Sequence, residues 1–498
     1  MNVNPITRLD YPDPDVIRVE DTYYMVSTTM HFMPGCEILQ SFDLVHWEHA
    51  TYVYETLDHT DAQQLKSGQN IYGQGMWAAS LRYHEGRFWI CFVANDTRKT
   101  YLYTSEKIDG PWKKQLIEGF YHDGSLLFDE DGRNYIVYGN DEIWITELNE
   151  DLTAPKKDGL HRLLVSDHKN PELGYEGSHI QKINGYYYIF LIHSLRDRWM
   201  RTEACFYSDS LEGEFTGGDV LCDDRGYCGQ GVAQGGIVDT PDGKWYAMLF
   251  QDSGAVGRIP ILLPVTWKDH FPFFGQNGHV PEEIEVHSTR PGYIYQPLVG
   301  SDDFCNGLLP RWQFNHDPDP RYYHLDALQG TYTITTREVC TELTQAVNTL
   351  TQRMSYPSCA AEVTVDASAL KEGDVAGLCA LQGCYAAVGI TKHHGKYEVL
   401  MLDKKEDGIL DMTEGTVVES HQMDFRLEAD FCNMKDEARC YYRVNKGDWL
   451  PIGTVHKLYF KLDHFTGCRF GLFCYAAEET GGSACFRDFK YYDVDEIS

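Results

Sequence analysis

Five segments of this 498-residue chain repeat one strand–turn–strand pattern and align without a gap. They begin at Asp13, Trp77, Asp123, Glu176 and Gln234. Near the middle, four of the five carry a glycine after Glu, Asp or Asn, as in Asn184-Gly185, and such pairs tolerate the positive φ angles of tight hairpin turns. The flanking runs are rich in Val, Ile, Tyr, Trp and Phe, which favour strands. Each segment is therefore predicted to be the first hairpin of a small antiparallel sheet.

The spacing of these segments predicts how the sheets are arranged. Successive segments start 46 to 64 residues apart, which is about the length of a four-stranded propeller blade. Five such units predict a five-bladed β-propeller over residues 1–296. A β-sandwich with recurrent hairpins is the alternative, and the gapless fivefold similarity favours the propeller.

The second half of the chain has a different pattern. A segment with Pro291 and Pro297 interrupts the repeats and is predicted to be a linker. Beyond it, runs such as AAEVTVDA and KYEVLMLD alternate as strands do, and no long helical periodicity occurs. We expect a β-sandwich over residues 297–498, so the predicted fold class is all-β.

The first position of each repeat is expected to face the axis of the propeller, because the innermost strands line the central channel. Three of these positions hold carboxylic acids, Asp13, Asp123 and Glu176, and the others hold Trp77 and Gln234. Converging acids repel one another and lose hydration. A fold keeps such an arrangement only with compensation, so we interpret these positions as a functional site.

Cleavage of a glycosidic bond requires such a set. A general acid protonates the leaving oxygen, and in an inverting enzyme a general base, roughly 6.5–9.5 Å away, activates water on the opposite face of the sugar. A third carboxylate near the acid helps to keep it protonated near neutral pH. Trp77 would supply a stacking platform for the sugar ring.

Composition excludes several other classes of function. The net charge of −32 disfavours nucleic acids and anionic membrane surfaces as partners. No apolar run could span a bilayer, and the first residues show no apolar signal segment. The 15 cysteines are scattered without paired metal-ligand spacing, so we expect reduced thiols and a cytoplasmic location. The oligomeric state is left open, with a homo-oligomer among the alternatives.

The sequence resembles glycoside hydrolase family 43, in its two-domain β-xylosidase and α-L-arabinofuranosidase branch. The motifs that carry the resemblance are YPDPDVIRVEDTYYMVST at 11–28, GMWAASLRYH at 75–84, DGSLLFDEDG at 123–132, YEGSHI at 175–180, QGGIVDTPDGKWY at 234–246 and GRIPILLPVTW at 257–267. The second half also resembles the concanavalin- or lectin-like sandwich of this branch. The resemblance implies that this sandwich narrows the pocket, through the loop around Phe465 or through the Asn315-His316 stretch.

The resemblance also implies roles for individual residues. Asp13 matches the general base and Glu176 the general acid, while Asp123 orients the acid and tunes its pKa. Arg258 is expected to reach sugar hydroxyls. Trp77 and Phe32 match walls of the sugar pocket, whereas Asp15 and His179 are expected to be structural.

One departure from the family concerns metal binding. Many relatives carry a histidine that supports a calcium ion where this chain has Gln234, which we assign to substrate binding. We therefore expect no metal and no cofactor, and calcium held through water and carbonyl oxygens is the alternative. No zinc signature occurs among the 20 histidines.

These observations predict an inverting exo-glycosidase that releases xylose from the non-reducing ends of β-1,4-xylo-oligosaccharides, with α-L-arabinofuranosidase side activity. A small pocket discriminates two similar sugars only modestly. The alternatives are an enzyme that is mainly an α-L-arabinofuranosidase, an endo-acting arabinanase and a non-catalytic carbohydrate-binding propeller.

Overall fold

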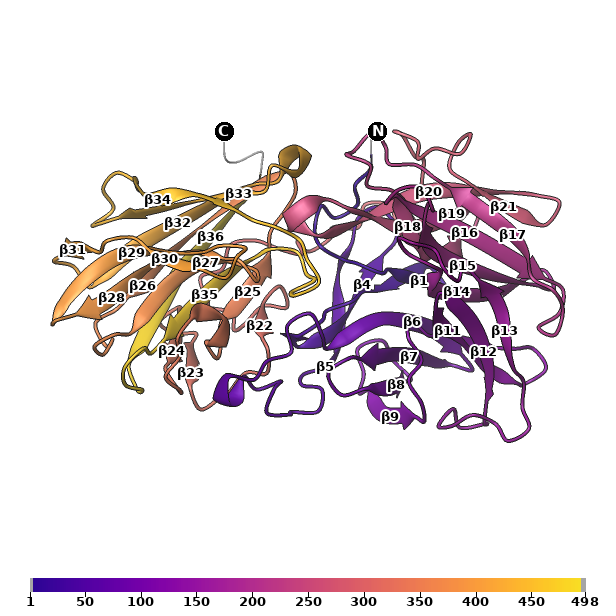
Figure 1. The fold of residues 1–498 in the computed structure, drawn as a ribbon, viewed down its shortest axis with the longest axis horizontal. Coiled ribbons are helices and arrows are strands. Elements are labelled where there is room, and N and C mark those ends of the chain that lie inside the picture. The colour runs from indigo at the N-terminus through magenta and orange to yellow at the C-terminus, as the bar shows by residue number, and fades with distance from the viewer. Residues whose placement is uncertain (1–2, 494–498) are drawn as a thin grey trace.

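The computed structural model describes residues 3–493 and consists of two β-rich lobes. In Figure 1 the indigo-to-magenta lobe on the right contains most of the strands from β1 to β21, and the orange-to-yellow lobe on the left contains β22 to β36. Helical structure in the described residues consists of 3-10 turns at Lys66–Gly68, Gly254–Val256, Leu343–Gln345 and Cys432–Met434. The prediction of an all-β chain is confirmed.

The right-hand lobe contains five four-stranded antiparallel sheets, which are the five predicted blades. Blade 1 contains β1 (Asp15–Val19), β2 (Thr22–Val26), β4 (Gly35–Ser41) and β5 (Glu48–Tyr54). Blade 2 contains β6 (Met76–His84), β7 (Arg87–Ala94), β8 (Lys99–Ser105) and β9 (Lys113–Ile117). Blade 3 contains β10 (Ser125–Phe128), β11 (Asn134–Asn140), β12 (Glu142–Leu148) and β13 (His161–Ser166). Blade 4 contains β14 (Glu176–Ile183), β15 (Tyr186–Ser194), β16 (Arg201–Ser208) and β17 (Thr216–Leu221). Blade 5 contains β18 (Val232–Asp239), β19 (Trp245–Asp252), β20 (Arg258–Lys268) and β21 (Phe271–Phe274).

The first hairpin of each blade corresponds to one sequence repeat. Asn184 and Gly185 both have positive φ, 51° and 84°, as a two-residue hairpin turn requires. Glu85 and Gly86 adopt the same conformation in blade 2. In blades 3 and 5 the Asp-Gly pair lies within a wider loop, so the short turn is not common to all five repeats.

A buried carboxylate beneath the channel mouth connects three of the blades. Asp15 accepts hydrogen bonds from the Leu81 N–H at 2.7 Å and from Arg82 at 2.8 Å, and it contacts His179 Nδ1 at 3.1 Å. Although burial opposes ionisation, Arg82 and His179 hold the pKa of the Asp15 carboxyl below its usual value. Asp15 and His179 therefore have the structural place expected from the sequence.

The left-hand lobe is a sandwich of two sheets. One sheet has the order β3 (Phe32–Met33), β22 (Gln313–Asn315), β25 (Leu350–Arg353), β35 (Arg469–Tyr475), β27 (Val375–Leu381), β28 (Ala386–His393), β29 (Lys396–Lys404) and β30 (Leu410–Met412), and β31 (Thr416–Val418) also pairs with β29. The other has the order β23 (Tyr323–Asp326), β24 (Thr331–Thr335), β36 (Ser483–Asp493), β26 (Ser358–Asp366), β32 (Gln422–Asp430), β33 (Glu437–Arg443) and β34 (Leu450–Lys457). The predicted sandwich is confirmed.

The two lobes share both a sheet and an apolar core. β3 comes from the propeller half of the sequence yet pairs with β22, so it extends a sheet of the sandwich. Ala255 and Val256, which precede β20, are fully buried in the same hydrophobic cluster as sandwich residues such as Phe470. The division at residues 296 and 297 stays a prediction, since β21 ends at Phe274 and β22 begins at Gln313.

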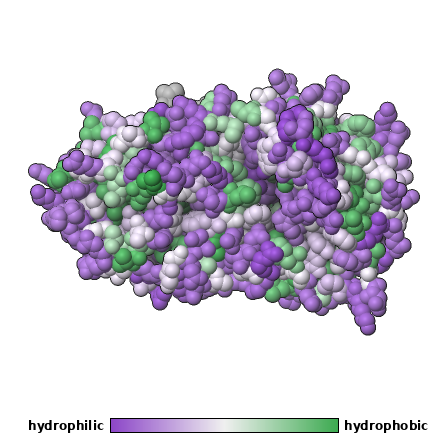
Figure 2. Space-filling view, viewed as in Figure 1, coloured by the Kyte–Doolittle hydropathy of each residue, from purple (hydrophilic) through white to green (hydrophobic). Residues whose placement is uncertain are grey.

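The surface and the cysteines agree with the composition. Hydrophilic residues cover most of the face shown in Figure 2, with hydrophobic residues gathered in smaller patches. All 15 cysteines are free thiols, and ten of them are buried. Within residues 3–493, no helix has the length and apolar character needed to cross a bilayer.

Candidate active site

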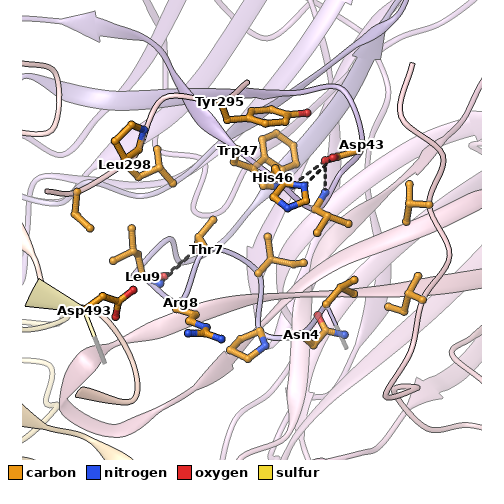
Figure 3. A pocket seen from close by; sticks show the side chains of 18 of the residues that line it. Asn4, Thr7, Arg8, Leu9, Asp43, His46, Trp47, Tyr295, Leu298 and Asp493 are labelled. Carbon is orange, nitrogen blue, oxygen red and sulfur yellow. Dashed lines mark hydrogen bonds and ion pairs between the residues drawn. The ribbon is translucent and has the colours of Figure 1, made fainter. Parts of the chain in front are cut away.

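Two hollows stand out by size, and the larger one does not contain the predicted site. Figure 3 shows this hollow of about 1100 Å³, which the N-terminal segment and residues 295–299 help to line. The Asp43 carboxylate there is already bound by the ring and the backbone N–H of His46. None of the residues that begin the five sequence repeats lines this hollow.

A second cavity, of about 600 Å³, contains all five of these residues. Its lining includes Asp13, Trp77, Asp123, Glu176 and Gln234. Side chains separated by up to 221 positions in the sequence are therefore gathered in one cavity, as the repeat pattern predicted. Their catalytic and binding roles stay predictions.

Local backbone conformation directs these side chains toward the axis. Asp13, Asp123 and Gln234 have φ values of 53°, 48° and 57°, which residues other than glycine rarely adopt. In blade 4 the positive φ, 65°, falls on Gly177 directly after Glu176, and a bulge follows in β14. Strained positions of this kind cost about 1–3 kcal/mol each and concentrate at functional sites.

Asp13 is buried and held from two sides. Its Oδ2 accepts a hydrogen bond from the Thr28 hydroxyl at 2.6 Å, and its Oδ1 pairs with Arg258 Nη1 at 2.9 Å. These two contacts hold the carboxylate in one orientation, which a general base needs in order to take a proton from water.

Asp123 lies beside a histidine that the sequence analysis did not single out. Its Oδ2 accepts the Gly177 N–H at 3.0 Å and lies 3.6 Å from His122 Nε2. Burial, together with the charges of Glu176 and Asp13, raises the pKa of Asp123 to about 6. Asp123, with smaller contributions from Glu176 and Asp13, raises the pKa of His122 to about 9. At neutral pH the two side chains therefore form an imidazolium–carboxylate pair.

Glu176 is the most accessible of the three carboxylates, with 22% of its side chain exposed. Its Oε2 accepts a hydrogen bond from the Asn140 amide at 2.8 Å and lies 3.5 Å from His122 Nε2. The Asn140 amide and the His122 ring therefore contact the same oxygen of Glu176. Oε1 has no hydrogen bond within residues 3–493, so no neighbouring side chain of the described residues holds this oxygen.

Arg258 and several aromatic rings line the cavity. Only Nη1 of Arg258 is used by Asp13, and the buried Nε and Nη2 have no hydrogen-bond partner among the described residues. The guanidinium therefore has donor capacity left for sugar hydroxyls. Phe465, from the sandwich, lies over this guanidinium at 4.3 Å and 5.5 Å from the Trp77 ring.

A carboxylate of the N-terminal segment fixes both Arg258 and the Phe465 loop. Asp10 Oδ1 accepts the Arg258 N–H and its Oδ2 accepts the Gly467 N–H, each at 2.8 Å. The two domains are thus joined directly beneath the cavity.

The expectation that Phe32 forms a wall of the sugar pocket is corrected by the structure. Phe32 is fully buried and does not line the cavity. Its ring lies under the Arg469 guanidinium at 3.4 Å, and its backbone pairs with Asn315 of the sandwich. Phe32 is therefore part of the domain interface, and so are the buried Asn315 and His316, which leaves Phe465 as the residue that narrows the pocket.

A fourth acidic side chain supports the site from behind. Glu203 on β16 is fully buried, and its Oε2 accepts the Gln234 N–H at 2.7 Å. The Gln234 side chain packs so closely on Gly177 that a Cβ there would fall 2.7 Å from Gln234 Cδ. Gly177 in turn holds Asp123 and follows Glu176. Glu203 thus holds the backbone of Gln234, whose side chain packs on Gly177 next to Glu176.

Metal ligands are brought together in two places within residues 3–493. Glu372, His393 and His394 form one group, and His122, Asp123 and Glu176 form the other. Calcium is bound by six to eight oxygens, whereas the second group contains a histidine and its Glu176 oxygen already accepts the Asn140 amide. These side chains do not fit a calcium cage, and the expectation of a metal-free enzyme stays a prediction.

Several cavity residues were not predicted from the sequence. His122 directly precedes Asp123, and Asn140 ends β11 next to Gly139, whose N–H donates to the His122 carbonyl. The cavity lining also includes Trp199, Arg201 and Asp252. Counting outward from the hairpin turn of blade 3 would have found Asn140, whereas nothing in the repeats marks the other three residues.

Comparisons with known proteins agree with this geometry. The model of "Glycosyl hydrolases family 43" matches residues 3–272, and that of "Beta xylosidase C-terminal Concanavalin A-like domain" matches residues 301–492. A β-xylosidase of Formosa agariphila is 26% identical over 99% of this chain and 89% of its own length. The xylosidase/arabinosidase 43B of Humicola insolens is 26% identical over 98% of this chain and 96% of its own length.

A solved structure named "Bifunctional GH43-CE", from Bacteroides eggerthii, superimposes with a TM-score of 0.92 and 42% identity. The match covers 98% of this chain and 63% of that longer protein. The likeness therefore extends over both domains of the present chain, and the other protein contains further sequence.

Proposed function

The chain belongs to glycosyl hydrolases family 43, and from this premise we propose that it is an inverting, exo-acting β-D-xylosidase. Its substrates are short β-1,4-xylo-oligosaccharides, from which it releases xylose at the non-reducing end, and α-L-arabinofuranosides are hydrolysed as a side activity. The observation that supports this proposal best is the cavity itself, in which Asp13, Asp123 and Glu176 lie together with Arg258.

The reaction follows from the hydrogen bonds of Asp13 and Glu176. Asp13, oriented by Thr28 and Arg258, takes a proton from a water molecule, and the resulting hydroxide attacks the anomeric carbon. The bond from that carbon to the leaving oxygen breaks, and Glu176 Oε1 gives its proton to that oxygen. The water attacks from the face opposite to the leaving group, so the configuration at the anomeric carbon inverts.

Asp123 and His122 prepare the acid for this step. Asn140 and His122 both contact Oε2 of Glu176, so in the proposed reaction Oε1 is the oxygen that donates the proton. Asp123, held by the Gly177 N–H, fixes the backbone that follows Glu176. These contacts orient the proton before the substrate binds, and such preorganisation lowers the barrier of proton transfer.

The contribution of the sandwich to the cavity supports exo action. Phe465 and Phe460, both from one loop of the sandwich, line the cavity beside Arg258. A pocket that ends at the carboxylates accepts a chain terminus, whereas an endo-acting enzyme requires an open groove.

An enzyme that is mainly an α-L-arabinofuranosidase is the second candidate, because one similar protein is named for both sugars. Parallel assays with 4-nitrophenyl β-D-xylopyranoside and 4-nitrophenyl α-L-arabinofuranoside separate the two candidates by their kcat/KM. Proton NMR of the first sugar released from the xyloside tests inversion, which gives α-xylose. β-Xylose as the first product would contradict the proposed mechanism. A cytoplasmic location stays a prediction.

A further inference from the structure

We propose that Trp199 and the Arg201–Asp252 ion pair form a separate subsite that binds the leaving-group sugar, a pyranose unit of the oligosaccharide. This inference rests on the proposed function, because it places the second sugar relative to the acid Glu176. It adds a specificity-determining region that the sequence repeats do not indicate.

The position of this region relative to the acid is the first argument. Glu176 lies on β14, the innermost strand of blade 4, and pairs with Ile192 on β15. Arg201 begins β16, the next strand outward, where it pairs with Ser194. Adjacent strands are about 4.8 Å apart, so Arg201 lies about 10 Å outward from the strand of Glu176. The leaving sugar must extend to the acid's side of the cavity, since Glu176 protonates its oxygen.

One aromatic ring contacts both Arg201 and Arg258, and so it sets the distance between this region and the part of the cavity where the cleaved sugar is proposed to bind. The buried Phe250 ring contacts two guanidinium groups, at 5.3 Å from that of Arg258 and 5.1 Å from that of Arg201. Arg258 contacts Asp13, and both arginines line the same cavity. The two arginines are therefore held at a fixed separation along one cavity, which suits neighbouring rings of one oligosaccharide.

Part of the hydrogen-bonding capacity of this region is not used by the described residues. Arg201 Nη1 pairs with Asp252 Oδ2 at 2.9 Å, with only 11% and 13% of the two side chains exposed. Arg201 Nε and Asp252 Oδ1 are buried without a hydrogen-bond partner in the described part of the chain. Buried polar groups left unpaired are costly, and the hydroxyls of a bound sugar would supply partners.

This region also has apolar surface, which suits the apolar face of a pyranose ring. Trp199 is 43% exposed, and its ring lies 5.5 Å from the Arg201 guanidinium, which supports it from one side. Across the cavity the sandwich contributes Leu462, which is 70% exposed, and Met434. An exposed indole beside a charged pair offers a stacking face and a hydrogen-bonding edge together, as sugar rings require.

The experiment compares two substrates that share the cleaved sugar and differ in the leaving group. β-D-Xylopyranosyl fluoride has no leaving sugar, whereas xylobiose has one. Trp199→Ala and Arg201→Gln are expected to lower kcat/KM for xylobiose about tenfold or more. The same variants should leave kcat/KM for the fluoride within about twofold of the wild type.

Two matched controls test whether the effect belongs to the cavity. Arg198→Gln removes an exposed arginine of the same loop, which pairs with Asp197 and does not line the cavity. Phe273→Ala removes an exposed aromatic ring from β21 at the edge of blade 5. Both should leave the ratio of the two kcat/KM values unchanged.

The outcomes separate this inference from the proposed function. Hydrolysis of both substrates by the wild type supports the proposed function by itself. If Trp199→Ala and Arg201→Gln then reduce both substrates equally, or neither, the assignment of a leaving-group subsite is overturned. If the wild type hydrolyses the fluoride but not xylobiose, a pyranose subsite is overturned while glycosidase activity stands. If it hydrolyses neither, the proposed xylosidase function fails first.

Discussion

The buried Glu203 allows the support of the active site to be tested through its protonation state. This side chain accepts one hydrogen bond, from the Gln234 N–H at 2.7 Å, and its Oε1 has no partner among the described residues. Complete burial without a neighbouring cation raises the pKa of Glu203 well above its usual value. Burial therefore favours the neutral form of Glu203, and we expect glutamine to replace it with little loss, whereas alanine should not.

The magnitude follows from what each variant leaves behind. Glu203→Ala leaves the Gln234 N–H buried and unpaired, which costs about 1–3 kcal/mol. The space left by the side chain adds about 1 kcal/mol or more. We expect a total loss of about 2–4 kcal/mol in the free energy of unfolding. Glu203→Gln keeps the carbonyl oxygen that accepts this bond, and it should cost less than about 1 kcal/mol.

Urea unfolding of the wild type and both variants measures these differences, and kcat for xylobiose reports the position of the catalytic carboxylates. Because the folded-state pKa of Glu203 is raised, the stability it contributes is present below about pH 4.5 and is lost as pH rises through the folded-state pKa. Glu203→Gln should remove this part of the pH dependence. A glutamine variant as unstable and inactive as the alanine variant would show that Glu203 is ionised and would refute the reasoning.

Four further predictions concern the cavity. Glu176→Ala should lose about 10²–10⁴ in kcat/KM on xylobiose and far less on an aryl xyloside with an acidic leaving group; equal losses would contradict its role as the acid. Asp13→Ala should slow both substrates by a similar factor of about 10² or more, and unchanged turnover would remove it as the base. Phe465→Ala should raise KM several-fold, because it opens the pocket above Arg258, while the exposed control Phe273→Ala should not change KM. The pKa of His122 is raised from 6.5 to about 9, so the stability that His122 contributes is present below pH 6.5 and is lost as pH rises through about 9. In urea unfolding, His122→Gln should abolish this decline in the free energy of unfolding. An unchanged decline would assign it to another group.

The sequence predicted what local repetition can encode. Each blade begins with a hairpin that forms its own contacts, so the alternation of strands and the Asn184-Gly185 turn were sufficient to identify it. The five repeat heads then followed from the symmetry of the ring, and all five line one cavity. Asn140 could have been found in the same way, because the register of the β10–β11 hairpin sets it opposite His122.

Contacts between the two domains were not predictable in this way. The Phe32 side chain was expected in the pocket because a resemblance at the level of motifs does not say which way a ring points. Its direction is set by β22, whose Asn315 pairs with it from 283 positions further along the chain. The sequence also could not decide whether Phe465 or the Asn315-His316 stretch narrows the pocket. That depends on how the sandwich packs on the propeller, and no periodic pattern in either stretch indicates it.

The sandwich is part of the active site because Arg258 depends on it for its position. The segment before Arg258 is buried in the sandwich core through Ala255 and Val256, and the Ala255 carbonyl accepts hydrogen bonds from the Cys468 N–H and the Gln382 amide. Asp10 then binds the N–H groups of Arg258 and of Gly467 with its two oxygens. Since Arg258 in turn binds Asp13, the proposed base, a shift of the sandwich would move both side chains. The propeller supplies the carboxylates through its fivefold repetition, whereas their alignment with the substrate requires both domains.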